Sequence, residues 1–160
     1  MVLKGPHAQE ALEWLCTASM DMAVNICQYT LMLNENAGIE AEITVTRTAD
    51  DEFYLVTGAA TTQYLLNFIQ KKVSTKFPNL VVSDITESVC ILSLQGPSSQ
   101  QVLQRISPQA EQLAQLSYGQ ATDIFLRGIE GQLIQAKYLF HQQLSSLSFS
   151  KTTFLSSIPE

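Results

Sequence analysis

The sequence predicts an α+β fold, with an antiparallel or mixed sheet and helices on one of its faces. Its 160 residues are 46% hydrophobic and 15% charged, which fills the core of about one domain and excludes disorder for most of the chain. Residues 39–46 alternate apolar and polar side chains, the pattern of a strand with one buried face. Two other segments repeat apolar residues at helical spacing. Helices and strands mixed along the chain in this way favour the α+β class.

The first elements are a helix and a hairpin. Gly5-Pro6 precedes a helix that we expect from residue 8 to about residue 17, because proline suits the first helical position. A short apolar run, residues 31–33, ends at a turn over residues 34–38. The alternating strand follows this turn, and a second strand over residues 53–56 completes the hairpin.

Alternation divides the side chains of the first hairpin strand between two faces. Apolar side chains at odd positions are expected to face the core, and polar side chains at even positions to face the opposite side. The first group is Ile39, Ala41, Ile43 and Val45, and the second includes Glu40, Glu42 and Thr44. Glu40 and Glu42 therefore share a face in this prediction.

The next elements repeat the same kinds of structure. A helix is expected over residues 61–74, with an apolar stripe that includes Tyr64. Strand candidates follow at residues 80–82 and 89–94. Gly96-Pro97-Ser98 then begins a helix that ends near residue 106. The resulting order, helix, strand, strand, helix, strand, strand, helix, is related to the ferredoxin-like arrangement.

The composition changes near residue 118. We expect residues 1–117 to form the folded domain, residues 118–143 to be a divergent segment, and residues 144–160 to be a Ser-rich tail with little regular structure. Serine and threonine are frequent in that tail, and its few large apolar residues follow neither helical nor strand spacing. Such a segment offers little apolar surface to bury.

The content of charge, cysteine and histidine argues against several functions. The net charge of −6 argues against nucleic-acid and anionic-membrane partners, and no run of about 18 apolar residues could span a membrane. Three cysteines and two histidines are widely spaced, so neither a metal site nor a disulfide scaffold is expected. No Gly-x-Gly-x-x-Gly dinucleotide motif occurs, and no presequence is visible.

Glu40 and Glu42 are the candidate reactive groups. Two carboxylates on one strand face, separated by about 7 Å of strand rise, could supply a general base and an electrostatic partner. The same spacing is more often found on a solvated sheet face. From the residues alone, both interpretations remain open.

Four stretches resemble the folate-binding aminomethyltransferase (glycine-cleavage T-protein) family. They are residues 3–6 (LKGP), 29–35 (YTLMLNE), 37–47 (AGIEAEITVTR) and 94–99 (LQGPSS). The resemblance covers roughly residues 2–110 and is closest to the C-terminal region of mitochondrial sarcosine and dimethylglycine dehydrogenases. Gly58 stands where the T-proteins have a pocket asparagine, which also favours the dehydrogenase branch.

This resemblance implies one-carbon chemistry with tetrahydrofolate, a small-molecule partner. Glu42 falls on the strand carboxylate that handles the proton or positive charge at the reacting nitrogen, where aspartate is the commonest family residue. Tyr29 and Val56 fall on positions of the folate pocket. FAD is implied only in a separate flavin domain of the parent protein, where an N-methyl amine is oxidised. The family also implies the mitochondrial matrix.

The same resemblance leads to two further expectations about this chain. The family continues with strands that close the folate site, so we expect the domain to be incomplete at its C-terminus and the chain to be a fragment or truncated form that is inactive by itself. Between the two carboxylates the family motif selects Glu42, which we expect to lie deeper, while Glu40 is solvated near the turn.

An alternative function belongs to a different class. A non-catalytic relative, resembling the regulatory subunit of pyruvate dehydrogenase phosphatase, shares this architecture. The carboxylate at Glu42 favours the folate-binding interpretation, whereas a hydrophobic or basic residue at that position would favour the regulator.

Overall fold

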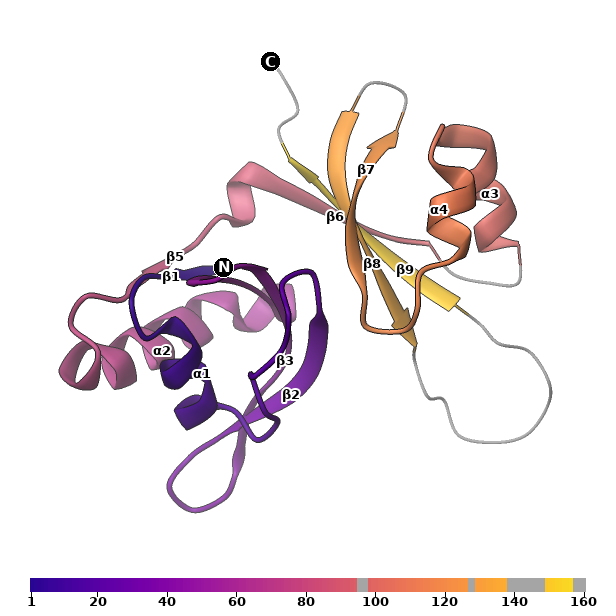
Figure 1. The fold of residues 1–160 in the computed structure, drawn as a ribbon. Helices are drawn as coiled ribbons and strands as arrows, with labels where there is room; N and C mark the ends of the chain where they lie inside the picture. Colours follow the sequence, from indigo (N-terminus) through magenta and orange to yellow (C-terminus); the bar gives the residue numbers. More distant parts are fainter. Residues whose placement is uncertain (95–97, 127–128, 138–148, 157–160) are drawn as a thin grey trace. The chain divides into compact units, whose positions relative to one another are not determined.

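The chain folds as two compact units, Met1–Ile85 and Thr86–Glu160 (Figure 1). The computed structural model describes residues 1–94, 98–126, 129–137 and 149–156. Each unit has its own sheet, and every strand pairing in both sheets is antiparallel among the described residues. The predicted α+β class with antiparallel pairing is confirmed. The division after residue 85 differs from the predicted boundaries after residues 117 and 143.

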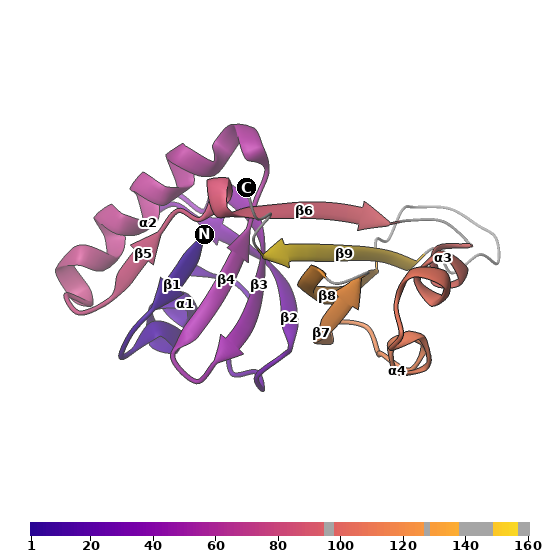
Figure 2. The ribbon, with the colours of Figure 1, turned by 90° about the horizontal axis from the view of Figure 1, so that it is seen from above.

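The first unit is built on a five-stranded sheet in the order β2-β3-β4-β1-β5, which can be followed in Figure 2. Its elements, in chain order, are β1 (Val2–Lys4), α1 (Ala8–Leu15), β2 (Cys27–Leu33), β3 (Ile39–Ala49), β4 (Glu52–Val56), the 3-10 helix η1 (Ala59–Thr61), α2 (Thr62–Lys76) and β5 (Val81–Ser83). If β2 is set aside, the order is β-α-β-β-α-β, which is the ferredoxin-like order.

Both helices of the first unit cover one face of this sheet. Leu12 of α1, Leu65 and Ile69 of α2, and Leu3 and Phe53 of the central strands are fully buried in one hydrophobic cluster. Strand residues on the same face alternate with exposed or half-buried ones, as the pleat requires. The opposite face of the sheet is therefore left free of the unit's own helices.

Strand β1 was missing from the sequence-based prediction. Its three residues are too few to show alternation. It is nevertheless central, because it pairs with β4 on one side and with β5 on the other. Its middle residue, Leu3, is wholly buried. A strand this short owes its position to tertiary packing rather than to local pattern.

The predicted alternation of β3 holds at three positions and is wrong at the fourth. Ala41, Ile43 and Val45 are buried as expected, but Ile39 is 62% exposed. The reason is a register shift, in which Met32 pairs with Ala41 while the next residue, Leu33, pairs with Ile39. Glu40 is thus an extra residue on β3, and such a β-bulge interrupts the alternation of faces.

Helix α2 also differs from its predicted apolar stripe at one position. Leu65, Ile69 and Val73 are buried, whereas Tyr64 is 54% exposed. Tyr64 lies in the first turn of the helix, and its hydroxyl donates a hydrogen bond to the Glu40 carboxylate. An amphipathic tyrosine can stay at the surface when its hydroxyl has a polar partner there.

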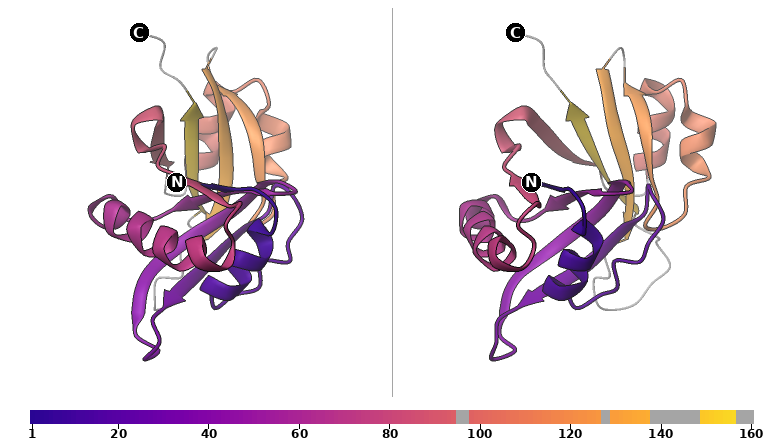
Figure 3. Two further views of the ribbon diagram at one scale, coloured as in Figure 1. Left: turned by 90° about the vertical axis from the view of Figure 1, so that its left-hand side faces the viewer. Right: turned by 60° about the vertical axis from the view of Figure 1, so that its left-hand side comes forward.

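The second unit packs helices against a four-stranded sheet in the order β6-β9-β8-β7 (Figure 3). Its described elements are the 3-10 helix η2 (Thr86–Ser88), β6 (Val89–Leu94), α3 (Ser99–Ile106), α4 (Ala110–Ala114), β7 (Ala121–Leu126), β8 (Ile129–Lys137) and β9 (Phe149–Ser156). Leu103, Leu113 and Ile124 form its buried cluster. Residues 96 and 97 of the predicted helix start lie outside the described residues, and Ser98 occupies the N-cap position of α3.

Part of the predicted Ser-rich tail forms a strand instead. Phe149–Ser156 is β9, which pairs with β6 on one side and β8 on the other. Threonine and phenylalanine favour strands, but the run has no polar–apolar alternation that would predict a strand from its own sequence. The remaining tail residues, 144–148 and 157–160, lie outside the described part of the chain.

Cys16 is expected to react slowly with thiol reagents. Burial raises its pKa to about 12, so the reactive thiolate is scarce at pH 8. We expect alkylation of Cys16 by iodoacetamide at pH 8 to be at least about 10-fold slower in the folded chain than in urea. Peptide mass spectrometry measures this rate at the single site. Equal rates in the two states would contradict the burial of this thiol.

Candidate functional site

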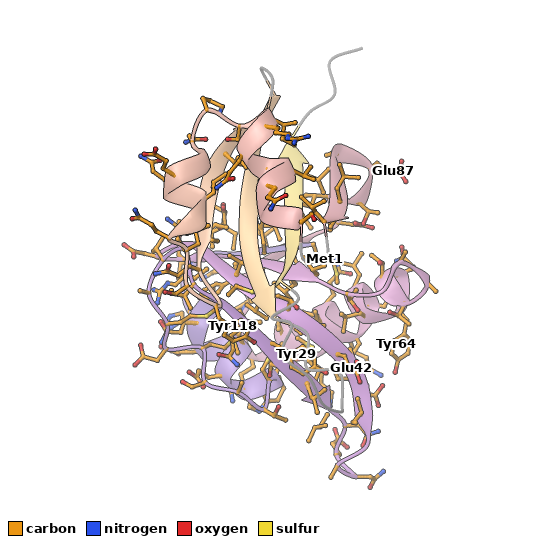
Figure 4. All side chains as sticks on the ribbon, turned by 90° about the vertical axis from the view of Figure 1, so that its right-hand side faces the viewer. Met1, Tyr29, Glu42, Tyr64, Glu87 and Tyr118 are labelled. Atoms are coloured by element: carbon orange, nitrogen blue, oxygen red, sulfur yellow. The ribbon has the colours of Figure 1, made fainter. Side chains whose placement is uncertain are left out.

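Three residues predicted for the site lie together on the free face of the five-stranded sheet. Tyr29 of β2 pairs with Thr44 of β3, and Thr44 pairs with Val56 of β4. These three side chains therefore form a row across neighbouring strands. Glu42 lies two residues before Thr44, on the same face of β3. Figure 4 shows Tyr29 and Glu42 beside each other.

The strand register explains why residues far apart in the sequence meet here. Directly opposed residues of an antiparallel pair have Cβ atoms about 4.5–5.5 Å apart. Leu31 opposes Glu42 and lies on the same face as Tyr29. Ile43 and Val45 point the other way into the core, and their burial fixes which face of β3 Glu42 occupies.

The environment of Tyr29, including the Glu42 carboxylate, changes the acidity of its phenol. The pKa of the Tyr29 phenol is raised, first by partial removal from water and then by the charge of Glu42 and a hydrogen bond to it. All three effects disfavour the phenolate. Tyr29 therefore remains a hydrogen-bond donor at neutral pH, and it can hold the carboxylate while leaving the remaining lone pairs of Glu42 for a ligand.

Thr57 and Thr61 form a border of the site beside Glu42. The pairing of β3 with β4 ends at Thr44 and Val56, so the earlier part of β3 has no β4 partner. Thr57 follows β4 and donates a hydrogen bond of 3.4 Å from Oγ1 to the carbonyl oxygen of Glu42. Its hydroxyl also lies 3.4 Å from that of Thr61 in η1.

Sequence reasoning missed Thr44 and Thr57 as site neighbours. Thr44 could have been found, because alternation places it on the same face as Glu42. Thr57 could not, because its contact with Glu42 depends on where β4 ends and how the chain turns into η1.

The expected depths of Glu40 and Glu42 are reversed in the structure. Glu42 is exposed, whereas Glu40 is half-buried and accepts hydrogen bonds from Asn34 (2.8 Å to Nδ2) and Tyr64. The β-bulge at Glu40 is the physical reason, because it breaks the regular spacing that would give both carboxylates the same surroundings. Glu40 is thereby held against α2, and Glu42 is left open on the sheet face.

The chemistry of this face suits a ligand with N–H donors and a flat ring. Glu42 supplies a carboxylate acceptor, Tyr29 an aromatic surface that is 51% exposed, and Val56 and Leu31 half-buried apolar contacts. These groups fit a reduced folate, whose pteridine carries N–H donors and a flat pyrimidinone ring. Among the described residues, no cluster of three or more His, Cys, Asp or Glu side chains is placed to bind a metal.

Comparison with known proteins identifies the family. The model of the GCVT N-terminal domain matches residues 1–139. The chain belongs to the GCVT N-terminal domain family. The matched region extends beyond residue 110, where the resemblance found in the sequence ended.

Curated relatives of this GCVT N-terminal domain include two oxidative enzymes. The chain is 32% identical over 122 residues to 4-methylaminobutanoate oxidase (formaldehyde-forming) from Paenarthrobacter nicotinovorans, covering 75% of this chain and 15% of that protein. It is 30% identical over 117 residues to mitochondrial sarcosine dehydrogenase from Mus musculus, covering 65% of this chain and 13% of the relative. The chain thus spans a small part of either enzyme.

A solved structure has the same fold. The glycine cleavage system aminomethyltransferase T from Bartonella henselae matches 97% of this chain and 38% of its own, with a TM-score of 0.74 and 22% identity. The chain is therefore an aminomethyltransferase-like domain related to sarcosine dehydrogenase. With enzymes as its relatives, the phosphatase-regulator alternative is not favoured.

No helix in the described part of the chain combines the length and hydropathy needed to cross a membrane.

Proposed function

We propose that this domain binds tetrahydrofolate on the face formed by Tyr29, Glu42 and Val56, and takes part in one-carbon transfer from an N-methyl amine. The observation that carries the proposal is the placement of Tyr29, Glu42 and Val56 on neighbouring strands of the helix-free face of the sheet, with Tyr29 beside Glu42. Its relatives by sequence include sarcosine dehydrogenase and a formaldehyde-forming oxidase, which supports an N-methyl amine as the carbon source.

Each residue has a definite task in this proposal. Tetrahydrofolate, when bound, supplies the nitrogens that receive the one-carbon unit. Glu42 accepts hydrogen bonds from N–H groups of the ligand and holds or takes up the proton released at the reacting nitrogen. Tyr29 donates to Glu42 and so fixes the carboxylate, and Val56 provides apolar contact for the ring. A carboxylate on a paired strand is held in place more firmly than one on a loop.

The wider context of the proposal follows from the relatives. The product is methylenetetrahydrofolate, formed in a sarcosine or dimethylglycine-dehydrogenase-like enzyme. The oxidation that generates the one-carbon unit belongs to an FAD-containing domain of the parent protein. This chain has no dinucleotide motif of its own. The mitochondrial matrix is the proposed location, because sarcosine dehydrogenase relatives are mitochondrial proteins.

Calorimetric titration with tetrahydrofolate under anaerobic conditions tests this function. We expect saturable binding with a Kd on the order of 10⁻⁵–10⁻⁴ M, which corresponds to about −7 to −5.5 kcal/mol. We expect this modest affinity because Tyr29 and Glu42 are exposed, so contact with them removes water from only part of the ligand surface. Absence of saturable binding at millimolar ligand would refute the proposal.

A pair of valine variants shows whether the ligand occupies this face. Val56→Asp is expected to weaken binding at least about 10-fold, because it replaces an apolar contact with a charge beside Glu42. Val81→Asp is the matched control, since Val81 is 59% exposed on β5 at the other edge of the sheet. Equal losses in both variants would place the ligand elsewhere.

A further inference from the structure

The turn between β2 and β3 is organised by a single side chain. Asn34 Oδ1 accepts hydrogen bonds from the backbone N–H groups of Asn36 (3.0 Å) and Gly38 (2.9 Å). Its Nδ2 atom donates to Glu40 Oε1 at 2.8 Å. Asn34 therefore links the turn to the bulged residue of β3, two positions before Glu42.

Helix α2 holds the same turn from a second direction. The Tyr64 hydroxyl donates to Glu40 Oε2, and Lys72 Nζ forms an ion pair of 2.7 Å with Glu35 Oε1 inside the turn. Tyr64 and Lys72 lie about two helical turns apart, on one side of α2. The hairpin is thus attached to the helix at two separate points.

These attachments act where the sheet gives β3 the least support. The β4 partner of β3 ends opposite Thr44, and the bulge at Glu40 interrupts pairing with β2. On the β4 side residues 39–43 therefore have no partner, and on the β2 side the ladder is regular at Ala41 and Glu42 but broken at Glu40. Side-chain contacts to Glu40 replace the restraint that a ladder would provide.

We propose that Tyr64 is a positioning residue that, through Glu40 and Asn34, holds the start of β3 so that Glu42 stays beside Tyr29. Whether Tyr64 keeps Glu42 beside Tyr29 can be measured without a ligand. The effect of that positioning on folate binding rests on the function proposed above. Tyr64 binds Glu40 through its hydroxyl, and it acts on Glu42 through Glu40.

The charges around Glu40 keep this network intact at neutral pH. The groups that face Glu40 are Tyr64 and Lys72 of α2 and Asn34 of the turn, with Glu35 paired to Lys72. Hydrogen bonds from Tyr64 and then Asn34 hold the pKa of Glu40 below its ordinary value, and Lys72 adds to this. The folded-state pKa is depressed, so the contribution of Glu40 is present above its ordinary pKa and is lost as pH falls through the lowered value.

Tyr64→Phe tests the proposal by deleting only the hydroxyl. Tyr118→Phe is the matched control, because Tyr118 is a similarly exposed tyrosine of the second unit. The first measurement is the alkaline titration of the Tyr29 ring by NMR. In Tyr64→Phe its midpoint should fall toward that of an ordinary tyrosine, because Glu42 is no longer held beside Tyr29. In Tyr118→Phe the titration midpoint of Tyr29 should equal that of the unsubstituted chain.

The second measurement is calorimetric binding of tetrahydrofolate to the same variants. Tyr64→Phe should raise Kd by about 3- to 10-fold, and Tyr118→Phe should not change it. An unmoved Tyr29 midpoint in Tyr64→Phe overturns the positioning role. A moved midpoint with unchanged Kd overturns its relevance to the ligand. If the unchanged chain binds no folate, the proposed function fails, and the Tyr29 midpoint alone decides the positioning role.

Discussion

Glu42→Gln is expected to weaken tetrahydrofolate binding by about 10- to 100-fold. A hydrogen bond to a charged group contributes about 1.5–3 kcal/mol, and glutamine keeps the size of the side chain while removing its charge. Glutamine also cannot take up a proton at the reacting nitrogen. In an enzyme that carries this domain, formation of methylenetetrahydrofolate should therefore fall by about 10²-fold or more, while amine oxidation at the flavin continues. Calorimetry of the chain and a methylenetetrahydrofolate assay of the enzyme measure the two effects.

Two variants show whether the loss belongs to the Glu42 carboxylate. Glu87→Gln removes a charge from an exposed glutamate in η2 of the second unit (Figure 4), and binding should be unchanged. Glu42→Asp keeps the charge with one methylene fewer and should retain much of the affinity. A loss from Glu42→Asp as large as that from Glu42→Gln would show that shape, and not charge, governs this position. A harmless Glu42→Gln would remove Glu42 from the proposed site.

Phe53→Ala is expected to destabilise the first unit by about 3–5 kcal/mol. Phe53 is fully buried on β4, opposite Leu3 on β1, and truncating a buried phenylalanine leaves a cavity. The Arg47 guanidinium lies 5.4 Å from the centre of its ring, so a cation–π contact is lost as well. Urea unfolding followed by the fluorescence of Trp14, the single tryptophan, reports on this unit.

The stability experiment has a milder variant and a surface control. Phe53→Leu keeps most of the apolar volume and should cost less than about 1.5 kcal/mol, so it remains measurable if Phe53→Ala does not fold. Tyr118→Ala removes a ring that is 63% exposed and should change the Trp14 transition by no more than about 0.5 kcal/mol. A similar cost for Phe53→Ala and Tyr118→Ala would contradict the central place of Phe53 in the core.

Much of the first unit could be predicted from local patterns. The helix near residue 8, the turn at residues 34–38 and strand β4 are found within a residue or two of their predicted positions, and β3 continues to Ala49, beyond the predicted residues 39–46. Alternation also placed Glu42 on the face opposite the buried Ile43. These features depend on neighbours a few residues away, so a short stretch of sequence contains the information that specifies them.

The second unit shows why other elements escaped prediction. Strand β9 is rich in serine and threonine, and its two partners, β6 and β8, come from separate parts of the chain. Its place in the middle of the sheet is invisible in its own pattern. The same holds for β1, whose three residues become a central strand only through partners roughly 50 to 80 residues away in sequence.

The amino-acid sequence determined which face of β3 presents Glu42, because burial of Ile43 and Val45 leaves only one side for polar residues. Only the tertiary structure decided how Glu40 and Glu42 differ in exposure and in hydrogen-bond partners. One extra residue in β3, matched against β2, turns Glu40 toward Tyr64 on α2 and leaves Glu42 beside Tyr29. Register between strands is set by pairing and packing across the sheet, and a pattern that looks uniform along one strand cannot reveal where that pairing slips.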